Sequence, residues 1–186
     1  MAASLGVTPL SLKAVVASYI VSLAVGIPIS GWIADRFGTR RVFSSAVALF
    51  TLASIACGLS VNVEMLVGAR ILQGLGAAMM TPVGRLAIIR TFDKSELLMA
   101  MNFVIIPALI GPLLGPTIGG LIVHWVSWRY IFFVNLPMGI AALLIIHRHM
   151  PDYRRDGRRP LDFVGLVLFS TGLAILSWLL EIFGLT

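Results

Sequence analysis

Six apolar runs follow one another along the chain, separated by short polar connections. They lie near residues 13–33, 43–62, 65–88, 99–123, 129–147 and 162–184. A helix needs about 20 apolar residues to cross a bilayer, and each run is of about that length. Because the charged residues are largely confined to the connections, the pattern predicts an all-α transmembrane fold with six membrane-spanning helices.

The composition agrees with a membrane protein. Hydrophobic residues make up 59% of the chain and charged residues 12%, whereas soluble domains are about half apolar and a quarter charged. A net charge of +6 would suggest nucleic-acid binding in a soluble protein. Here the basic residues lie between apolar runs, so we expect a lipid bilayer and no nucleic acid as partner. The single cysteine, Cys57, lies inside an apolar run, which favours a core position over a disulfide or a metal site.

Basic residues alternate between successive connections. Ten lie in the first, third and fifth connections, and one lies in the second and fourth together; the five connections are residues 35–41, 61–64, 90–96, 124–129 and 147–162. Since basic connections are retained in the cytoplasm, the first, third and fifth are predicted to be cytoplasmic and both termini to lie outside. We interpret 148–161, rich in arginine and aspartate, as a cytoplasmic linker between a five-span unit, 1–147, and a last span, 162–186.

The first connection belongs to the stretch "GWIADRFGTRR", residues 31–41. We expect Gly31 to let a neighbouring helix approach closely and Gly38 to permit a tight turn between antiparallel helices. Asp35 is expected to form a cytoplasmic charge cluster with three arginines, Arg36, Arg40 and Arg41. The alternative is a solvated loop that only obeys the positive-inside rule.

The third apolar run contains "RILQGLGAA", in which one helix face carries Arg70, Gln73, Gly74 and Ala77. A charge within a membrane is costly, so it normally faces the protein interior and has a partner. Polar groups beside small residues indicate a face that both lines a cavity and packs closely; a structural core arginine is the alternative. Arg85, further along the same helix, is expected to reach the membrane interface.

The fourth run contains "GPLLGPTIGG", residues 111–120. Its prolines, Pro112 and Pro116, predict a kinked helix. Its glycines form a ridge suited to close helix packing, and they are Gly111, Gly115, Gly119 and Gly120. We expect this flat face to pack against a partner helix and to pivot there; the alternative is a tolerated proline beside a dimer face.

The fifth run begins with "WRYIFFVNLPMG", residues 128–139, which supplies a further set of candidate residues: Trp128, Arg129, Asn135 and Pro137. The aromatic side chains at this helix start, Trp125, Trp128 and Tyr130, are expected to form an interfacial belt. An aromatic interface followed by an ordinary proline-containing helix is the alternative interpretation.

Together these stretches resemble the motifs of the major facilitator superfamily. The stretch 31–41 resembles the loop between that fold's second and third helices, and 70–78 resembles a fourth-helix motif of proton-coupled members. The stretch 111–120 resembles the fifth-helix antiporter motif, and 128–139 the sixth-helix start in the fourteen-spanner drug:proton antiporter branch of EmrB/QacA type. "SGWIADRFGTRRVF" and "AAMMTPVGRLAI" are similar to its MdtD/HsrA-like subgroup.

The resemblance implies a partial major facilitator N-terminal helix bundle in a bacterial inner membrane. It implies a transporter rather than an enzyme, which exports lipophilic, often cationic compounds in exchange for protons and needs no cofactor. By match, Arg70, Gln73 and Gly74 would act in coupling, and the charged stretch 31–41 would gate the cytoplasmic side. The glycines and prolines of 111–120 would prevent leak and set the direction of exchange.

Two departures limit what this chain is expected to do. Nothing in it matches the family's first helix, with its aspartate motif, or the family's C-terminal half. Of eight carboxylates only Glu181 lies within an apolar run, and the histidines, His124, His147 and His149, lie at helix ends. We therefore expect a fragment that does not transport alone. The acid that completes proton coupling is expected outside it, and the missing transporter half is a candidate partner. A metabolite symporter or uniporter and a non-transporting truncated or assembly protein remain as alternatives.

Overall fold

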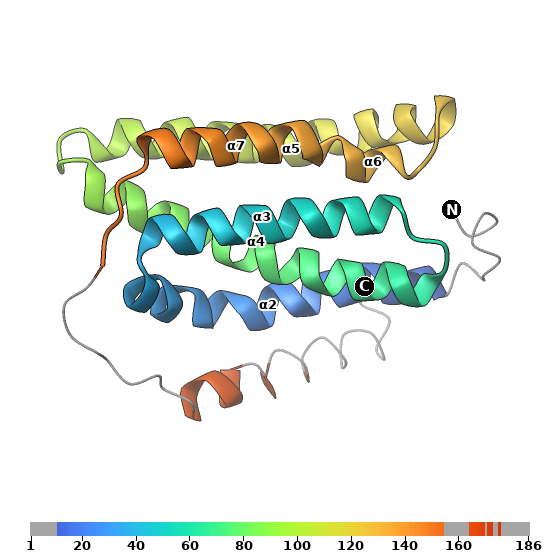
Figure 1. Ribbon diagram of the computed structural model, residues 1–186, viewed down its shortest axis with the longest axis horizontal. Coiled ribbons are helices and arrows are strands. Elements are labelled where there is room, and N and C mark those ends of the chain that lie inside the picture. Colours follow the sequence, from blue (N-terminus) through green and yellow to red (C-terminus); the bar gives the residue numbers. More distant parts are fainter. Residues whose placement is uncertain (1–10, 155–163, 170, 173–174, 176–186) are drawn as a thin grey trace.

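A computed structural model describes residues 11–154, 164–169, 171–172 and 175, and these residues form helices and short connections without a strand. The helices lie side by side as an elongated bundle (Figure 1). They are α2 (Ser11–Phe37), α3 (Thr39–Gly58), α4 (Val63–Thr91), α5 (Leu97–Trp125), α6 (Tyr130–Phe133) and α7 (Asn135–His149).

Five stretches of the described chain are long and apolar enough to cross a membrane, with α6 and α7 together forming the fifth. The first five predicted spans are therefore confirmed, with bounds shifted by a few residues. The sixth predicted span, 162–184, lies largely outside the described residues, although residues 164–169 are helical. Glu181 also lies outside the described residues.

Local sequence sets the helix ends. Gly38 separates α2 from α3 with φ +96°, the left-handed region that favours glycine, so the predicted tight turn is confirmed. Asn62 precedes α4, and its side chain accepts a hydrogen bond of 2.8 Å from the backbone N–H of Met65. The break between α6 and α7 falls at Val134 because Pro137 has no N–H to donate to the carbonyl of Phe133.

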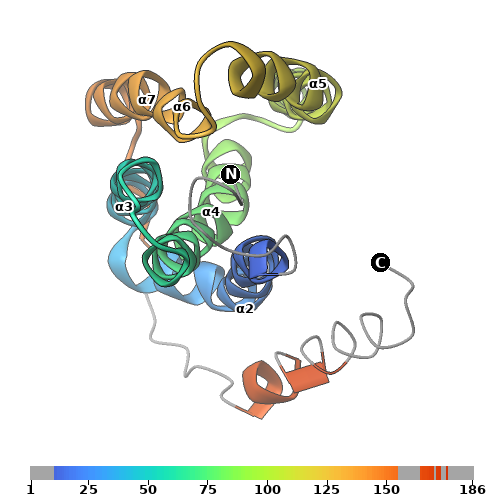
Figure 2. The same cartoon turned by 90° about the vertical axis from the view of Figure 1, so that its right-hand side faces the viewer.

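Helix α4 is the centre of the bundle, since it packs along both α2 and α3, and α7 packs on α3 (Figure 2). Two groups of buried apolar side chains hold these contacts. One group joins α2, α3, α4 and the start of α6 and contains Val15, Cys57, Leu66, Ala69, Trp128 and Phe132. The other lies toward the opposite ends of α2 and α4 and contains Ala34, Val42 and Val83. Helix α5 lies to one side, touches α4 and α6 sparsely, and has no buried residue.

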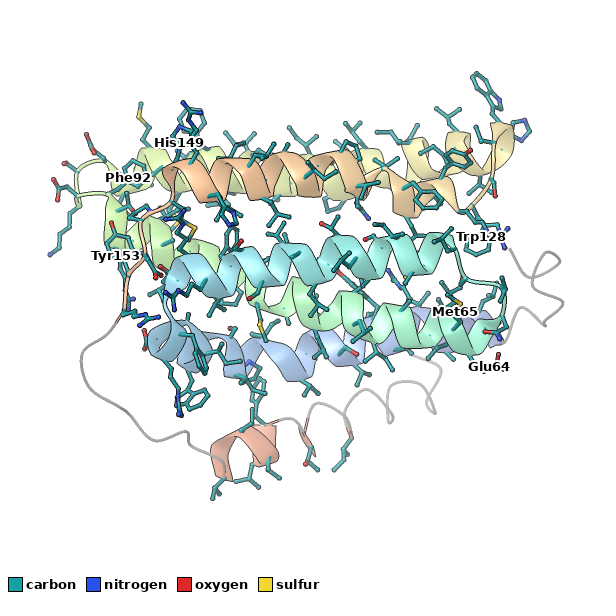
Figure 3. The ribbon with its side chains drawn as sticks, viewed as in Figure 1. Glu64, Met65, Phe92, Trp128, His149 and Tyr153 are labelled. Atoms are coloured by element: carbon teal, nitrogen blue, oxygen red, sulfur yellow. The ribbon has the colours of Figure 1, made fainter. Side chains whose placement is uncertain are left out.

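The connections alternate between the two ends of the bundle. Phe92, His149 and Tyr153 lie at one end, and Glu64, Met65 and Trp128 lie at the other (Figure 3). The backbone of Tyr153 is hydrogen-bonded to Thr39 at the α2–α3 turn, with an N–H to carbonyl distance of 3.0 Å. The described parts of the three basic connections therefore share one end of the molecule, as the charge alternation requires.

Candidate functional site

Arg70, on α4, is partnered by neutral groups. Its Nη1 donates to Oε1 of Gln73 at 2.8 Å, and its Nε lies 3.5 Å from the backbone carbonyl oxygen of Val15 on α2. Its guanidinium carbon lies 4.2 Å from the ring centroid of Tyr19 and 5.9 Å from that of Phe132. Carbonyl oxygens and aromatic faces both attract a cation, so the half-buried guanidinium is satisfied without a described carboxylate.

Gln73 extends this contact into a chain of hydrogen bonds across four helices. Its Nε2 donates to Oγ of Ser54 on α3 at 2.6 Å, and Nδ2 of Asn135 on α7 lies 3.4 Å from the same oxygen. Sγ of Cys57 lies 3.9 Å from the Gln73 Oε1. We call these five residues, Arg70, Gln73, Ser54, Cys57 and Asn135, the polar network. Since polar groups in a low-dielectric interior must be paired, each member fixes the position of its neighbours.

The face of α4 that carries the polar network is packed between helices. Gln73 is only 2% exposed, and a Cβ on Gly74 would lie 2.7 Å from the backbone oxygen of Tyr19. A Cβ on Gly76 would lie 2.9 Å from the backbone nitrogen of Phe50 on α3. The prediction of close packing is confirmed. The prediction that Gln73 lines an open cavity is wrong for this structure, because α2 and α3 approach α4 at backbone distance.

The charged stretch 31–41 divides its charges between two sites. Asp35 pairs with Arg90 at the end of α4, with Oδ1 and Nη2 2.8 Å apart, and not with the arginines of its own loop. Nη1 of Arg90 is buried without a hydrogen-bond partner among the described residues. Arg36 lies over the rings of Trp32 and Phe37, at 5.1 and 5.6 Å from their centroids.

Asp152, from the fifth connection, lies at the start of α3. Its Oδ1 accepts a hydrogen bond of 3.1 Å from the backbone N–H of Arg40, and its Oδ2 lies 4.0 Å from Nε of Arg41. A guanidinium nitrogen of Arg40 donates to the backbone carbonyl of His147 at the end of α7. A carboxylate at a helix N-terminus is favoured by the unpaired N–H groups and the helix dipole. A Cβ on Gly38 would collide with this carboxylate, which is a second reason for glycine there.

Gly31 and Arg85 both have exposed positions within the described part of the chain. No described atom lies within 4 Å of a Cβ built on Gly31, so the predicted close approach at this glycine is wrong for the described residues. Arg85 is exposed, in agreement with a side chain that reaches the membrane interface.

The glycine–proline ridge of α5 is bare. No described atom lies within 4 Å of a Cβ built on any of its glycines, Gly111, Gly115, Gly119 and Gly120. Pro112 and Pro116 lie within the helix and are exposed. The predicted packing of this ridge against a partner helix does not occur within the described part of the chain.

The α6 region combines predicted and unpredicted contacts. Trp128 is 6% exposed and packs edge-on against Phe132, so its assignment to an interfacial belt is wrong; Trp125 and Tyr130 are exposed, as a belt requires. Arg129 donates from Nη2 to the backbone carbonyl of Ser60 at 3.1 Å and ties the start of α6 to the end of α3. Pro137 is exposed in the first turn of α7, where a missing N–H breaks no hydrogen bond within that helix.

Several residues that organise these sites were not predicted from the sequence. Ser54 and Gly76 are small residues in apolar runs, and such residues occur at many helix contacts, so their spacing alone carried little information. Arg90 and Asp152 were counted as loop charges, and nothing local marks their partners. Each pairs with a residue more than 50 positions away in sequence.

Comparisons with known proteins agree with this geometry. A profile of the Major Facilitator Superfamily matches residues 1–185. A protein of Serratia proteamaculans that bears the name multidrug resistance protein MdtD is 45% identical over 181 residues, and one of the same name from Cronobacter sakazakii is 47% identical over 181 residues. Each match covers 97% of this chain and 38% of the relative, so the chain spans less than half the length of these proteins.

Solved structures share the fold at low sequence identity. A crystal structure of the peptide transporter POT in complex with sulfate superposes with a TM-score of 0.72 at 18% identity, over 96% of this chain and 38% of that one. The complex of POT with alafosfalin gives a TM-score of 0.69, also at 18% identity, over 95% of this chain and 39% of that one. At such identity the likeness concerns the fold. The profile match over nearly the whole chain shows that this multi-pass membrane protein belongs to the Major Facilitator Superfamily.

Proposed function

We propose that this chain forms part of a multidrug efflux transporter that exports lipophilic, often cationic compounds in exchange for protons. The observation that carries the proposal is the identity of 45–47%, over 97% of the chain, to relatives named for multidrug resistance. The bilayer, the exported compound, the proton and the remainder of such a transporter are its proposed partners. The proton gradient would supply the energy without a cofactor.

Within this proposal, Arg70 and Gln73 contribute the charge-sensitive part of the site. A guanidinium held by a glutamine, a carbonyl and two aromatic rings has no counter-charge of its own among the described residues. Such a group stabilises a deprotonated acid, or repels a bound cation, when either comes near it. That property supports coupling between proton binding and the release of a cationic compound.

The shared end of the three basic connections supports a cytoplasmic location for that end in a bacterial inner membrane. There the Asp35–Arg90 pair joins α2 to α4, and the contact of Asp152 with Arg40 joins the fifth connection to α3. Charged contacts of this kind can break and re-form as helices move, which is the gating role proposed for the stretch 31–41. The bare ridge of α5 supports a contact with the rest of the transporter.

The proposal is tested with a chimaera in which this chain replaces the matching segment of the Cronobacter sakazakii relative. In everted membrane vesicles, a cationic dye should accumulate when the proton gradient is formed and be released when a protonophore is added. Arg70→Gln should abolish this accumulation, whereas Arg85→Gln, an exposed arginine on the same helix, should retain most of it.

Accumulation driven by a sodium gradient, or accumulation of sugars or small metabolites but no dye, would contradict the proposal. The 186-residue chain alone in proteoliposomes is expected to give no efflux, because alternating access requires two bundles that move against each other. Proton-dependent efflux by the chain alone would overturn that expectation.

A further inference from the structure

An open cavity of about 520 Å³ lies where α3 begins and α7 ends. Its lining combines basic, hydroxyl and carboxylate side chains with one alanine: Arg40, Arg41, Ser44, Ser45, Ala48, His147 and Asp152. Helices α3 and α7 run along one side of the bundle (Figure 2), and the cavity belongs to the end that carries the basic connections. None of its residues is part of the polar network around Arg70.

Two hydrogen-bond donors in this cavity, the side chains of Arg41 and Ser44, are not used within the described chain. The side chain of Arg41 is 72% exposed, and its Nε lies 4.0 Å from Oδ2 of Asp152, beyond hydrogen-bonding distance. The hydroxyl of Ser44 makes no hydrogen bond with a described residue. The cavity therefore offers a guanidinium and a hydroxyl to an acceptor.

The charges of the cavity favour an anion. Arg40 and Arg41 face a single carboxylate, that of Asp152. This carboxylate already accepts from the backbone N–H at the start of α3, so it is held at the helix terminus. One positive charge remains in excess, and arginine with hydroxyl donors is the combination that binds a phosphate group well.

The two helices that line the cavity also carry exposed apolar side chains. Toward the middle of the bundle, α3 presents Leu52, which is 65% exposed, and α7 presents Leu144, which is 67% exposed and lies one turn before His147. A free inorganic phosphate makes no favourable contact with apolar side chains, whereas the acyl chains of a lipid pack against them. Helices α3 and α7 thus carry both a basic cavity and exposed leucines. An amphipathic anion, with a charged head group and an apolar tail, matches this combination.

From this geometry we infer that the α3–α7 cavity binds the phosphate of an anionic phospholipid, with the acyl chains lying along the exposed leucines of α3 and α7. Basic pockets at the cytoplasmic ends of membrane helices bind lipid head groups through the same combination of charge and apolar surface. The site is separate from the polar network and does not depend on the transport activity proposed above. It would anchor the start of α3 to the lipid surface.

Native mass spectrometry of the full chain, released from detergent micelles with added phosphatidylglycerol, tests the inference. We expect one lipid to stay bound, and Arg41→Gln to weaken its binding about fivefold, as is typical for the loss of one arginine near an anionic head group. Ser44→Ala should weaken binding less, and Arg41→Lys should restore most of it. Arg36→Gln removes the same charge at the same end but outside the cavity, and should leave binding unchanged.

Each other outcome overturns the inference. Equal retention of phosphatidylcholine would show that the site does not select an anionic lipid. Displacement of the lipid by millimolar inorganic phosphate would assign the cavity to a free anion. Equal losses for Arg36→Gln and Arg41→Gln would indicate a diffuse effect of charge and no built site. Circular dichroism of each variant verifies its helix content, and the mild Ser44→Ala change provides a reading if Arg41→Gln does not fold.

Discussion

Helices α4 and α5 carry similar sequence features and have opposite environments. Both are 29 residues long, contain proline, and present small residues at helical spacing. On α4 these small residues touch the backbones of α2 and α3, and polar side chains are paired beside them. On α5 the glycines touch no described atom. A small-residue ridge therefore marks a helix face fit for close packing, while the identity of the partner depends on the rest of the fold.

Polar residues account for much of this difference. Helix α4 has Arg70 and Gln73 in its apolar part, and both require partners in a low-dielectric environment, which pins α4 to its neighbours. The middle of α5 has no such group, so lipid can cover it at no electrostatic cost. In a membrane, where the hydrophobic effect does not separate helix contacts from lipid contacts, buried polar pairs and close packing decide the arrangement.

Replacing one glycine by alanine on α4 and one on α5 should give the largest difference in the free energy of unfolding. Gly76→Ala would place a Cβ 2.9 Å from the backbone nitrogen of Phe50 and 3.0 Å from the backbone oxygen of Ala46, so α3 must move. We expect a loss of about 1–3 kcal/mol in the free energy of unfolding. Gly115→Ala meets no described atom and should be neutral or raise stability by up to about 1 kcal/mol. Both values can be measured by denaturant titration in micelles; equal losses would contradict the contrast.

Removing the central amide of the polar network should have a somewhat smaller effect. Gln73→Leu leaves the Arg70 guanidinium without its 2.8 Å acceptor and Ser54 without its 2.6 Å donor. We expect a loss of about 1–2 kcal/mol in the free energy of unfolding. The matched control is Asn102→Leu, which replaces an exposed amide on α5 and should change stability little. A neutral Gln73→Leu would mean that packing alone holds α4 in place.

Charged side chains at the end of α4 and the start of α5 should differ in coupling free energy by a smaller amount. The Asp35–Arg90 pair, at 2.8 Å, joins the end of α4 to α2, and both side chains are partly exposed, which reduces its net value. A double-mutant cycle with Asp35→Asn and Arg90→Gln should give a coupling free energy of about 0.5–1 kcal/mol. Glu96, at the start of α5, is exposed and its carboxylate has no described partner, so Glu96→Gln combined with Arg90→Gln should show no coupling.

The sequence predicted the spans well and the contacts between them unevenly. Span length follows from the length of each apolar run, which is read directly from the sequence. The tight turn at Gly38 follows from the backbone freedom of glycine. The interior location of Arg70 followed from its cost in lipid. The partners of Asp35 and Asp152 depend on how helices are rotated and on where a distant connection returns, and no local pattern encodes either. Trp128 was misassigned because helix-end tryptophans occur both in interfacial belts and in cores.

The smallest effect on stability is expected from the carboxylates at two helix starts, Asp152 at the start of the packed helix α3 and Glu96 at the start of the sparsely packed helix α5. Asp152 accepts from the second N–H of α3, whereas the residue that precedes α5, Glu96, makes no side-chain cap. Asp152→Asn keeps an acceptor oxygen and removes the charge, so stability should fall by only about 0.3–1 kcal/mol, and the loss should shrink as salt is added. Asp152→Ala removes the acceptor as well and should cost more. If Asp152→Ala and Glu96→Ala gave equal changes in the unfolding midpoint, the connection after α7 would add nothing to the start of α3. Helix α3 would then be held by its contacts along α4, α6 and α7.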